Sequence, residues 1–197
     1  MSRLVQGARY KVRFRRRREG KTDYHRRYTY VLSKVTRIVI RRTNKYIYAR
    51  VMTFNPKGDE VVVSSSSIEL KKKYQWKGDG KNLSACYLTG YLLGKKAEKL
   101  NIEKLVVDLG PFKVREGGRI YAVIKGIQDA GLKFAFGDVE IDMNRIRGEH
   151  IAQYAKTLKE TQPEKYQQLF SKYLKEGLNP EELTEHFDQI FSKIRGE

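Results

Sequence analysis

The sequence predicts an α/β protein whose mixed sheet begins with an antiparallel three-strand meander and continues as helix, strand, helix, strand. Two observations support this class. Short stretches of alternating apolar and polar residues, separated by turn signals, follow one another between residues 37 and 65. From residue 84 onward, apolar residues recur instead at the three- and four-residue spacing of amphipathic helices.

The meander is expected to consist of three strands over residues 37–43, 46–54 and 60–65. Side chains alternate between the two faces of a strand. The first strand would therefore bury Ile38 and Ile40, and the second would bury Ile47 and Val51. Segment 55–59, Asn-Pro-Lys-Gly-Asp, is a strong turn signal and indicates the second connection.

The second half of the core is expected to contain a helix, a buried strand, another helix and a short last strand, over residues 84–100, 104–109, 119–130 and 132–136. Ser84 is the predicted N-cap of the first helix, and Gly131 is the predicted C-cap of the second. Gly90 and Gly94 lie one helical turn apart and would let that helix approach another backbone closely.

Helical patterns also fill the end of the chain, over 144–159, between Pro163 and Gly177, and after Asn179, which is the expected cap of the last helix. This region is nearly neutral and amphipathic, so we expect it to pack on the core or on a protein neighbour. The chain thus divides into a basic arm, an α/β core and a helical C-terminal region, with boundaries at 1–33, 34–137 and 138–197.

The positive charge is concentrated at the start of the chain. The net charge is +18, and residues 1–50 hold 17 Lys and Arg against two acidic residues. Such an arm repels itself unless a polyanion neutralises it, and nucleic acid is the usual polyanion. No membrane partner is expected, because the longest apolar runs are far too short to span a bilayer. Cys86 is a lone cysteine and no secretory signal is visible, which favours a cytoplasmic setting.

The arm carries most of the candidate nucleic-acid contacts. Arginine forks bind phosphate, and aromatic rings stack on unpaired bases. A targeting address or a solvated tail is the alternative, but the charge extends over the whole arm and is interleaved with aromatic residues. The candidates there are Arg9, Lys11, Arg13, Arg15, Arg16, Arg17, Arg18, Lys21, Thr22, Tyr24, Arg26 and Arg27.

The outer face of the meander is a second candidate surface. It carries Arg37, Arg41, Tyr46, Tyr48 and Arg50. Two interpretations stay open from the pattern alone: an RNA platform, or a partly covered sheet face with ordinary cross-strand pairs. The first interpretation adds Arg41, Tyr48 and Arg50 to the predicted contacts.

The pattern offers little support for an enzyme. Asp108 ends a strand, but no carboxylates at helpful spacing accompany it, so a turn residue is favoured over a metal ligand. Gly117 and Gly118 before a helix are a weak phosphate-loop signal and are better explained as a turn. Cys86 is expected to be a small core residue. We therefore predict no catalytic residues, no metal site and no cofactor.

Several ordered motifs resemble one family, the 5S-rRNA-binding protein of the large ribosomal subunit in its archaeal and eukaryotic form, the eighteenth large-subunit protein in archaeal naming. The resemblance covers about residues 9–160 and fades in the last forty. The long basic tail of eukaryotic members is missing, which favours the archaeal form. The matching segments are 15–24, 42–51, 80–90, 104–110, 126–134 and 145–152.

The resemblance implies more than the pattern. It implies a core like that of ribonuclease H without its catalytic carboxylates, and binding to 5S rRNA, with further contacts to 23S rRNA and to neighbouring large-subunit proteins in the central protuberance. It also implies RNA contacts along residues 15–27 and around Asn44 and Lys45. The alternatives are an RNA-processing nuclease on a similar core and a ribosome-assembly factor.

The charge of the arm predicts a strong salt dependence. A protein that neutralises six to ten phosphates loses roughly a thousandfold to a hundred-thousandfold in affinity for duplex DNA between about 50 and 200 mM salt. We expect a similarly steep fall in affinity for 5S rRNA, measured by titration at several salt concentrations. A flat profile would contradict an electrostatic role for the arm.

Overall fold

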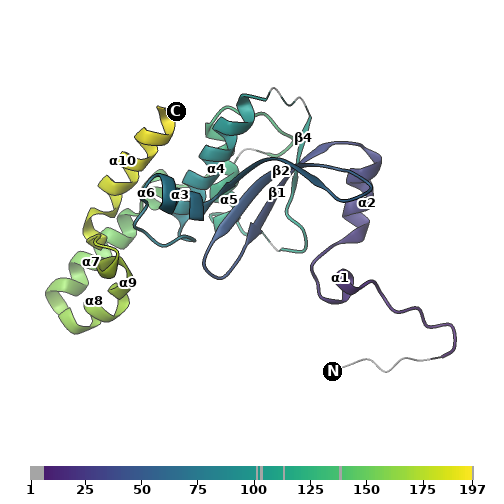
Figure 1. The fold of residues 1–197 in the computed structure, drawn as a ribbon. Coiled ribbons are helices and arrows are strands. Elements are labelled where there is room, and N and C mark those ends of the chain that lie inside the picture. Colours follow the sequence, from purple (N-terminus) through teal and green to yellow (C-terminus); the bar gives the residue numbers. More distant parts are fainter. Residues whose placement is uncertain (1–6, 101, 103, 113, 138, 197) are drawn as a thin grey trace.

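The computed structural model describes residues 7–100, 102, 104–112, 114–137 and 139–196. One mixed sheet lies at its centre, with the strand order β3-β2-β1-β4 (Figure 1). Strand β1 pairs antiparallel with β2, β2 pairs antiparallel with β3, and β1 pairs parallel with β4. The predicted meander and α/β class are confirmed. The strands are β1 (Thr36–Arg42), β2 (Ile47–Thr53), β3 (Glu60–Ser66) and β4 (Leu105–Asp108).

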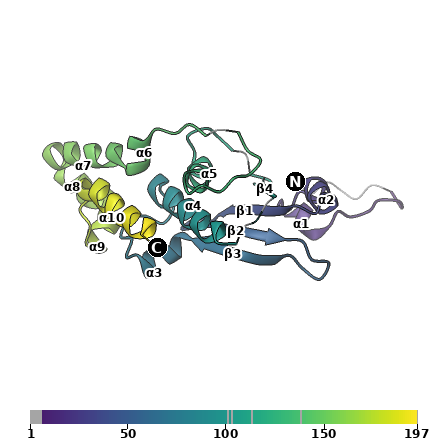
Figure 2. The ribbon, with the colours of Figure 1, turned by 90° about the horizontal axis from the view of Figure 1, so that it is seen from above.

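Helices precede, interrupt and follow the sheet. Figures 1 and 2 place the first two helices at one end of the molecule and the last four at the other. None of the helices in the described segments is long and apolar enough to cross a membrane. They are α1 (Arg15–Arg18), α2 (Tyr24–Leu32), α3 (Ser67–Lys73), α4 (Leu83–Glu98), α5 (Arg119–Asp129), α6 (Met143–Arg147), α7 (Glu149–Thr161), α8 (Pro163–Leu169), α9 (Ser171–Lys175) and α10 (Leu183–Arg195), with the 3-10 turn η1 (Pro180–Glu182) before α10.

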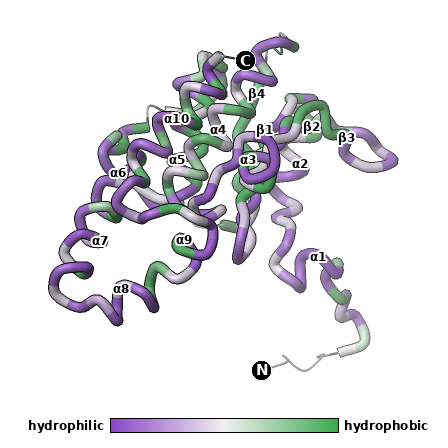
Figure 3. The backbone as a smooth tube through the Cα atoms, turned by 60° about the vertical axis from the view of Figure 1, so that its left-hand side comes forward, coloured by the Kyte–Doolittle hydropathy of each residue, from purple (hydrophilic) through white to green (hydrophobic). Residues whose placement is uncertain are grey.

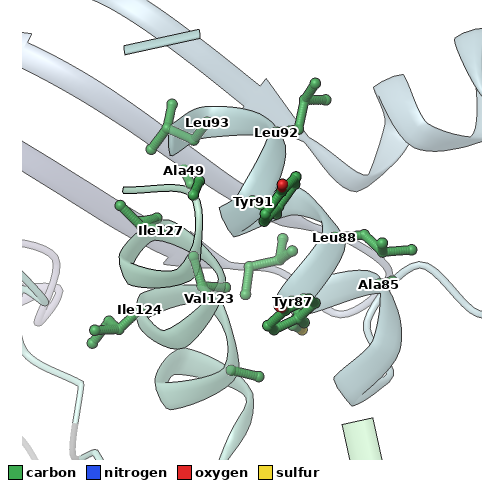
Figure 4. Close-up of a cluster of buried hydrophobic side chains, with 14 of the residues drawn as sticks. Ala49, Ala85, Tyr87, Leu88, Tyr91, Leu92, Leu93, Val123, Ile124 and Ile127 are labelled. Atoms are coloured by element: carbon green, nitrogen blue, oxygen red, sulfur yellow. The ribbon is translucent and has the colours of Figure 1, made fainter. Parts of the chain in front are cut away.

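The core lies between the sheet and the pair α4 and α5, and Figure 4 shows buried apolar side chains of both helices. Glycines bring these two helices into backbone contact. A Cβ added to Gly90 would lie 2.1 Å from the carbonyl oxygen of Val123, and one added to Gly126 would lie 2.3 Å from that of Tyr87. The expected close approach at Gly90 is confirmed, and Gly126 makes it reciprocal.

Three local predictions for the core are wrong or incomplete. Asn82, not Ser84, caps α4: its side-chain oxygen accepts a hydrogen bond from the Ala85 N–H at 2.8 Å. The Ser84 hydroxyl is buried and donates instead to the carbonyl of Ile146 at 2.6 Å. The expected last strand is reduced to one parallel bridge between Val106 and Ala135. Helix α3 was not predicted.

The C-terminal helices differ in detail from the prediction. The single helix expected over 144–159 is interrupted at Gly148, whose φ is +89°. The next segment breaks at Phe170 between α8 and α9. Asn179 makes no side-chain cap bond, and its amide donates to the Glu182 carboxylate at 3.0 Å. The expectation that this region packs on the core is confirmed, since Phe187 and Ile194 belong to the same buried cluster as the sheet.

The contact between α4 and α5 predicts a large cost for a single methyl group. Gly90→Ala should lower the free energy of unfolding by about 1–3 kcal/mol, because the added Cβ has no room beside the Val123 backbone. This loss would appear although alanine favours a helix by roughly 1 kcal/mol over glycine. Urea unfolding measures it. Gly137→Ala, which meets no atom within 4 Å, is the control and should change stability by less than about 0.5 kcal/mol.

Candidate nucleic-acid interface

The predicted arm residues lie at the surface. Residues 10–14 form no helix or strand, and α1 and α2 contain no buried residue. The hydrophilic character of much of this segment is visible in Figure 3. Asp23 caps α2, with its carboxylate accepting hydrogen bonds from the N–H groups of His25 and Arg26. The side chains of Arg9, Lys11, Arg13, Arg15, Arg17 and Arg18 are thus available to a partner.

Short contacts fold the arm back on itself between residues 14 and 24. The Arg16 Nε donates a hydrogen bond to the Thr22 hydroxyl at 2.8 Å. The rings of Phe14 and Tyr24 lie 5.3 Å apart. Lys21 lies 2.7 Å from Glu19 and holds the pKa of that carboxyl below its usual value. These contacts bring together the predicted site residues Arg16, Thr22, Tyr24 and Lys21.

A chain of carboxylates and guanidinium groups joins α2 to the outer face of the sheet. The two Arg27 nitrogens donate to Asp59 at 2.6 and 2.7 Å. Arg37 donates to Asp59 at 2.8 Å and to Asp108 at 3.3 Å. Arg41 donates to the Asp108 carboxylate at 3.4 Å and to its carbonyl at 3.0 Å. We call Arg27, Asp59, Arg37, Asp108 and Arg41 the ion-pair chain.

Two residues that were predicted to lie on the outer sheet face, Arg37 and Arg41, are members of the ion-pair chain. Arg37 is 2% exposed, so it belongs to the interior and not to a platform. Arg41 forms an ion pair with Asp108. The outer sheet face is therefore a partly covered face, as the second interpretation had it, with Arg50 exposed beside the Tyr48 ring at 5.4 Å.

Contacts within the ion-pair chain shift the pKa values of two of its members, Asp59 and Arg27. The two hydrogen bonds from Arg27, and then the one from Arg37, lower the pKa of Asp59, against the opposing effect of burial. The bonds to Asp59 also raise the pKa of Arg27. Asp59 was not among the predicted site residues. It is the last residue of the turn signal over 55–59, and that signal gives no hint that its carboxylate accepts hydrogen bonds from two arginines of other elements.

A cavity of about 240 Å³ lies between the arm and the outer sheet face. Seven basic side chains and three carboxylates line it. It brings together predicted residues from the arm, β1 and β2, whereas Asn44 and Lys45 lie apart from it in the exposed turn between those strands. The basic lining residues are Arg16, Lys21, Arg26, Arg27, Arg37, Arg41 and Arg50.

Asp108 is a turn residue, as predicted. One carboxylate oxygen accepts a hydrogen bond from the Gly110 N–H at 2.8 Å, and the other receives Arg37 and Arg41. No group of three or more His, Cys, Asp or Glu side chains arranged to hold a metal occurs among the described residues. Cys86 is a buried core residue, and burial raises the pKa of its thiol to about 12.

The fold is thus that of an α/β protein with an exposed basic arm, which arginine–carboxylate pairs dock on the sheet beside a basic cavity. Residues 8–107 match the family described as "Ribosomal large subunit proteins 60S L5, and 50S L18". The chain belongs to this family and is a structural protein of the large ribosomal subunit.

Relatives from archaea extend the match along the whole chain. The large ribosomal subunit protein uL18 of Sulfurisphaera tokodaii is 52% identical over 192 residues, which cover 98% of both chains. The protein of the same name from Saccharolobus solfataricus is 50% identical over 99% of this chain and 98% of the relative. The one from Ignicoccus hospitalis is 49% identical over 97% and 94%. These matches extend beyond residues 9–160, the part of the chain over which the motifs resemble the family.

The ion-pair chain predicts a stability difference between two otherwise similar carboxylates. Asp59→Asn should lower the free energy of unfolding at pH 7 by about 1.5–3 kcal/mol, because it weakens charged hydrogen bonds to an arginine that is 2% exposed. The matched control is Asp188→Asn, which breaks an arginine pair at the surface and should cost at most about 1 kcal/mol. Urea unfolding compares them.

The same pair of variants has an expected pH dependence. Because the pKa of Asp59 is lowered in the folded protein, its contribution is complete above the unfolded carboxyl pKa of about 4 and is lost as the pH falls through the folded pKa. The stability difference between the wild type and Asp59→Asn should therefore shrink below pH 4. A difference that stays constant down to pH 2 would contradict the assigned cause.

Proposed function

We propose that this chain binds 5S rRNA and helps attach it to 23S rRNA and to neighbouring proteins in the central protuberance of the large subunit. The observation that carries the proposal is the concentration of exposed basic side chains from the arm, with the cavity that joins them to the sheet. Arginine forks suit phosphate, and the interleaved aromatic rings suit unpaired bases.

Residues from three elements form the proposed contact surface. The arm supplies most of them, β1 and β2 supply Arg41, Tyr48 and Arg50, and the turn between those strands supplies Asn44 and Lys45. All of these side chains are exposed or half-buried, which supports the assignment. In this division of roles, residues 1–33 bind RNA, 34–137 hold the arm in place and 138–197 extend the core.

We also propose that the core is of the ribonuclease H kind. The strand order β3-β2-β1-β4 supports this, as does the extension of the parallel side by the bridge at Ala135. A nuclease on such a core would use carboxylates to hold a metal. Here the carboxylate of Asp108, at the end of β4, accepts hydrogen bonds from Arg37, Arg41 and the Gly110 N–H, which favours a scaffold over the nuclease alternative.

Charge reversal in the arm tests the proposal. Arg16→Glu with Arg17→Glu should weaken binding to 5S rRNA at least a hundredfold at fixed salt. Each lost charged hydrogen bond is worth roughly 1.5–3 kcal/mol before the added repulsion is counted. Lys156→Glu with Lys165→Glu makes the same charge change on exposed positions of α7 and α8 and is the control.

The readout is titration against 5S rRNA, with tRNA as the competitor and circular dichroism as the folding check. The control variant should bind within about tenfold of the wild type. Equal losses of affinity for both variants would mean that only the net charge of the protein matters, and would contradict specific contacts by the arm. Metal-dependent cleavage of RNA by the purified wild type would instead favour the nuclease.

A further inference from the structure

The loop over residues 74–82, which joins α3 to α4, contains the only tryptophan of the sequence and is called the Trp76 loop below. The Trp76 side chain is 2% exposed, and the loop folds closely around it. A Cβ added to Gly78 would lie 2.6 Å from the indole ring, and the indole N–H donates to the Asp79 carbonyl at 3.3 Å. Gln75 has a φ of +60°, which side chains other than glycine rarely adopt. Contacts with other elements must therefore hold the loop in this conformation.

Helix α10 and the turn before it supply such contacts, at the end of the molecule where α3 meets the C-terminal helices (Figure 2). The His186 ring stacks on Trp76, with 5.1 Å between ring centres and 22° between ring planes. Its Nε2 accepts a hydrogen bond from the Lys77 N–H at 3.1 Å. The Lys77 ammonium donates to the Gly177 carbonyl at 3.2 Å. One imidazole therefore contacts both the indole and the backbone of the loop.

The other side of the Trp76 loop packs against the turn between β1 and β2. A Cβ added to Gly80 would lie 2.8 Å from the Tyr46 ring and 2.9 Å from the Lys45 carbonyl oxygen. The loop thus lies between α10 and the turn that carries Asn44 and Lys45. A movement of the loop away from α10 would reach this turn.

The hydrogen bond to Lys77 requires a neutral imidazole. A neutral histidine has one nitrogen that accepts and one that donates, so acceptance at Nε2 places the proton of His186 on Nδ1. A second proton, on Nε2, would turn the acceptor into a donor that faces the Lys77 N–H, and the hydrogen bond would be lost. The ring is half-buried, so protons from the solvent reach it.

The surroundings of His186 favour the neutral ring. Burial, and then the positive charges of Lys77 in the loop and Lys193 in α10, lower its pKa. His186 also lies in the first turn of α10, where the helix dipole disfavours a positive charge. The face of Trp76 attracts a cation, but the balance of these effects still lowers the pKa.

Carboxylates of the surrounding elements are engaged with other partners. Glu185, the neighbour of His186 in α10, is exposed to solvent. The remaining carboxylates of the loop, of η1 and of the segment after α9 each have a partner: Asp79 with Lys172, Glu182 with Asn179, and Glu176 with Lys71. The positive neighbours of His186 therefore dominate, and the imidazole is neutral at pH 7.

We propose that His186 is a pH-sensitive latch, which holds the Trp76 loop on α10 when it is neutral and releases the loop when it is protonated. Helix α10 stays in place because Phe187 and Ile190 are buried in the core, so the loop is the part that moves. Release would loosen the support of the turn at Asn44 and Lys45. The latch does not rest on the proposed function, and it is measured without RNA.

Trp76 is itself the probe, because its fluorescence reports on this one site. The full-length protein is titrated from about pH 8 to about pH 4.5, on both sides of the ordinary histidine pKa of about 6.5. The emission should shift to longer wavelength and become more accessible to acrylamide in one step. The midpoint should lie below about 6.5, because the pKa of His186 is lowered.

Amide hydrogen exchange measures the release directly. Protection of the Lys77 N–H should fall in the same step, because its hydrogen-bond acceptor is lost. The N–H of Tyr74, which donates to the Leu70 carbonyl at the end of α3, should remain protected and is the internal control.

Three variants separate the hydrogen bond from the ring stacking. His186→Gln keeps an acceptor but does not titrate, so the loop should stay closed and the step should disappear. His186→Phe keeps a stacked ring without an acceptor, so Trp76 should be accessible at every pH. The matched control is His150→Gln, which removes the histidine of α7, whose pKa burial also lowers, and should leave the step unchanged.

Four outcomes would overturn the latch. A step that persists in His186→Gln would assign the change to another group. Weaker emission with unchanged protection of the Lys77 N–H would mean that the proton quenches Trp76 without releasing the loop. A parallel loss of the helical circular dichroism signal would reveal general unfolding by acid, and the absence of any step would show that the contact is insensitive to pH. If His186→Gln does not fold, the Lys77 and Tyr74 amides of the wild type decide between release and a closed loop.

Discussion

Arg37 carries a full positive charge on β1 and is 2% exposed, so its charge must be neutralised inside the protein. Asp59, in the turn before β3, and Asp108, at the end of β4, do so. The same two carboxylates bind Arg27 of α2 and Arg41 of β1. One buried charge thus ties together the meander, its parallel neighbour and the helix that follows the arm. The position of the arm on the sheet depends on this chain of ion pairs.

Because the ion-pair chain uses some of the basic side chains internally, the count of arginines overstates what remains for RNA. Arg37 serves the interior, while Arg27 and Arg41 are shared between the fold and the cavity. The arginines of α1 are exposed, and their only carboxylate contact in the described part of the chain is that of Arg15 with Glu19 at 3.8 Å. The arginines of α1, which are proposed to bind RNA, are therefore distinct from Arg37, which orients the arm on the sheet.

On the inner face of the sheet, the backbone contact between α4 and α5 fixes the positions of elements, as the ion-pair chain does on the outer face. Gly90 and Gly126 let the two helices touch, which brings the start of α5 close to the start of α4. A basic cavity of about 840 Å³ lies where those two helix ends meet the loop after β4, with Arg42, Arg115, Arg119 and Arg145 in its lining. Packing of the apolar core on this side and the ion pairs on the other together determine where each basic surface lies.

The sequence by itself determined the meander, the main helices and the basic arm, because these depend on local patterns. Alternating apolar residues define β1 and β2, Asp23 caps α2, and the charge of the first fifty residues needs no tertiary information. Only the tertiary structure decided that Arg37 is buried, that Asn82 caps α4 while Ser84 bonds to Ile146, and that arginines from four segments surround one cavity. Those outcomes depend on partners far away along the chain, and a local pattern cannot show which distant group will neutralise a charge or accept a proton.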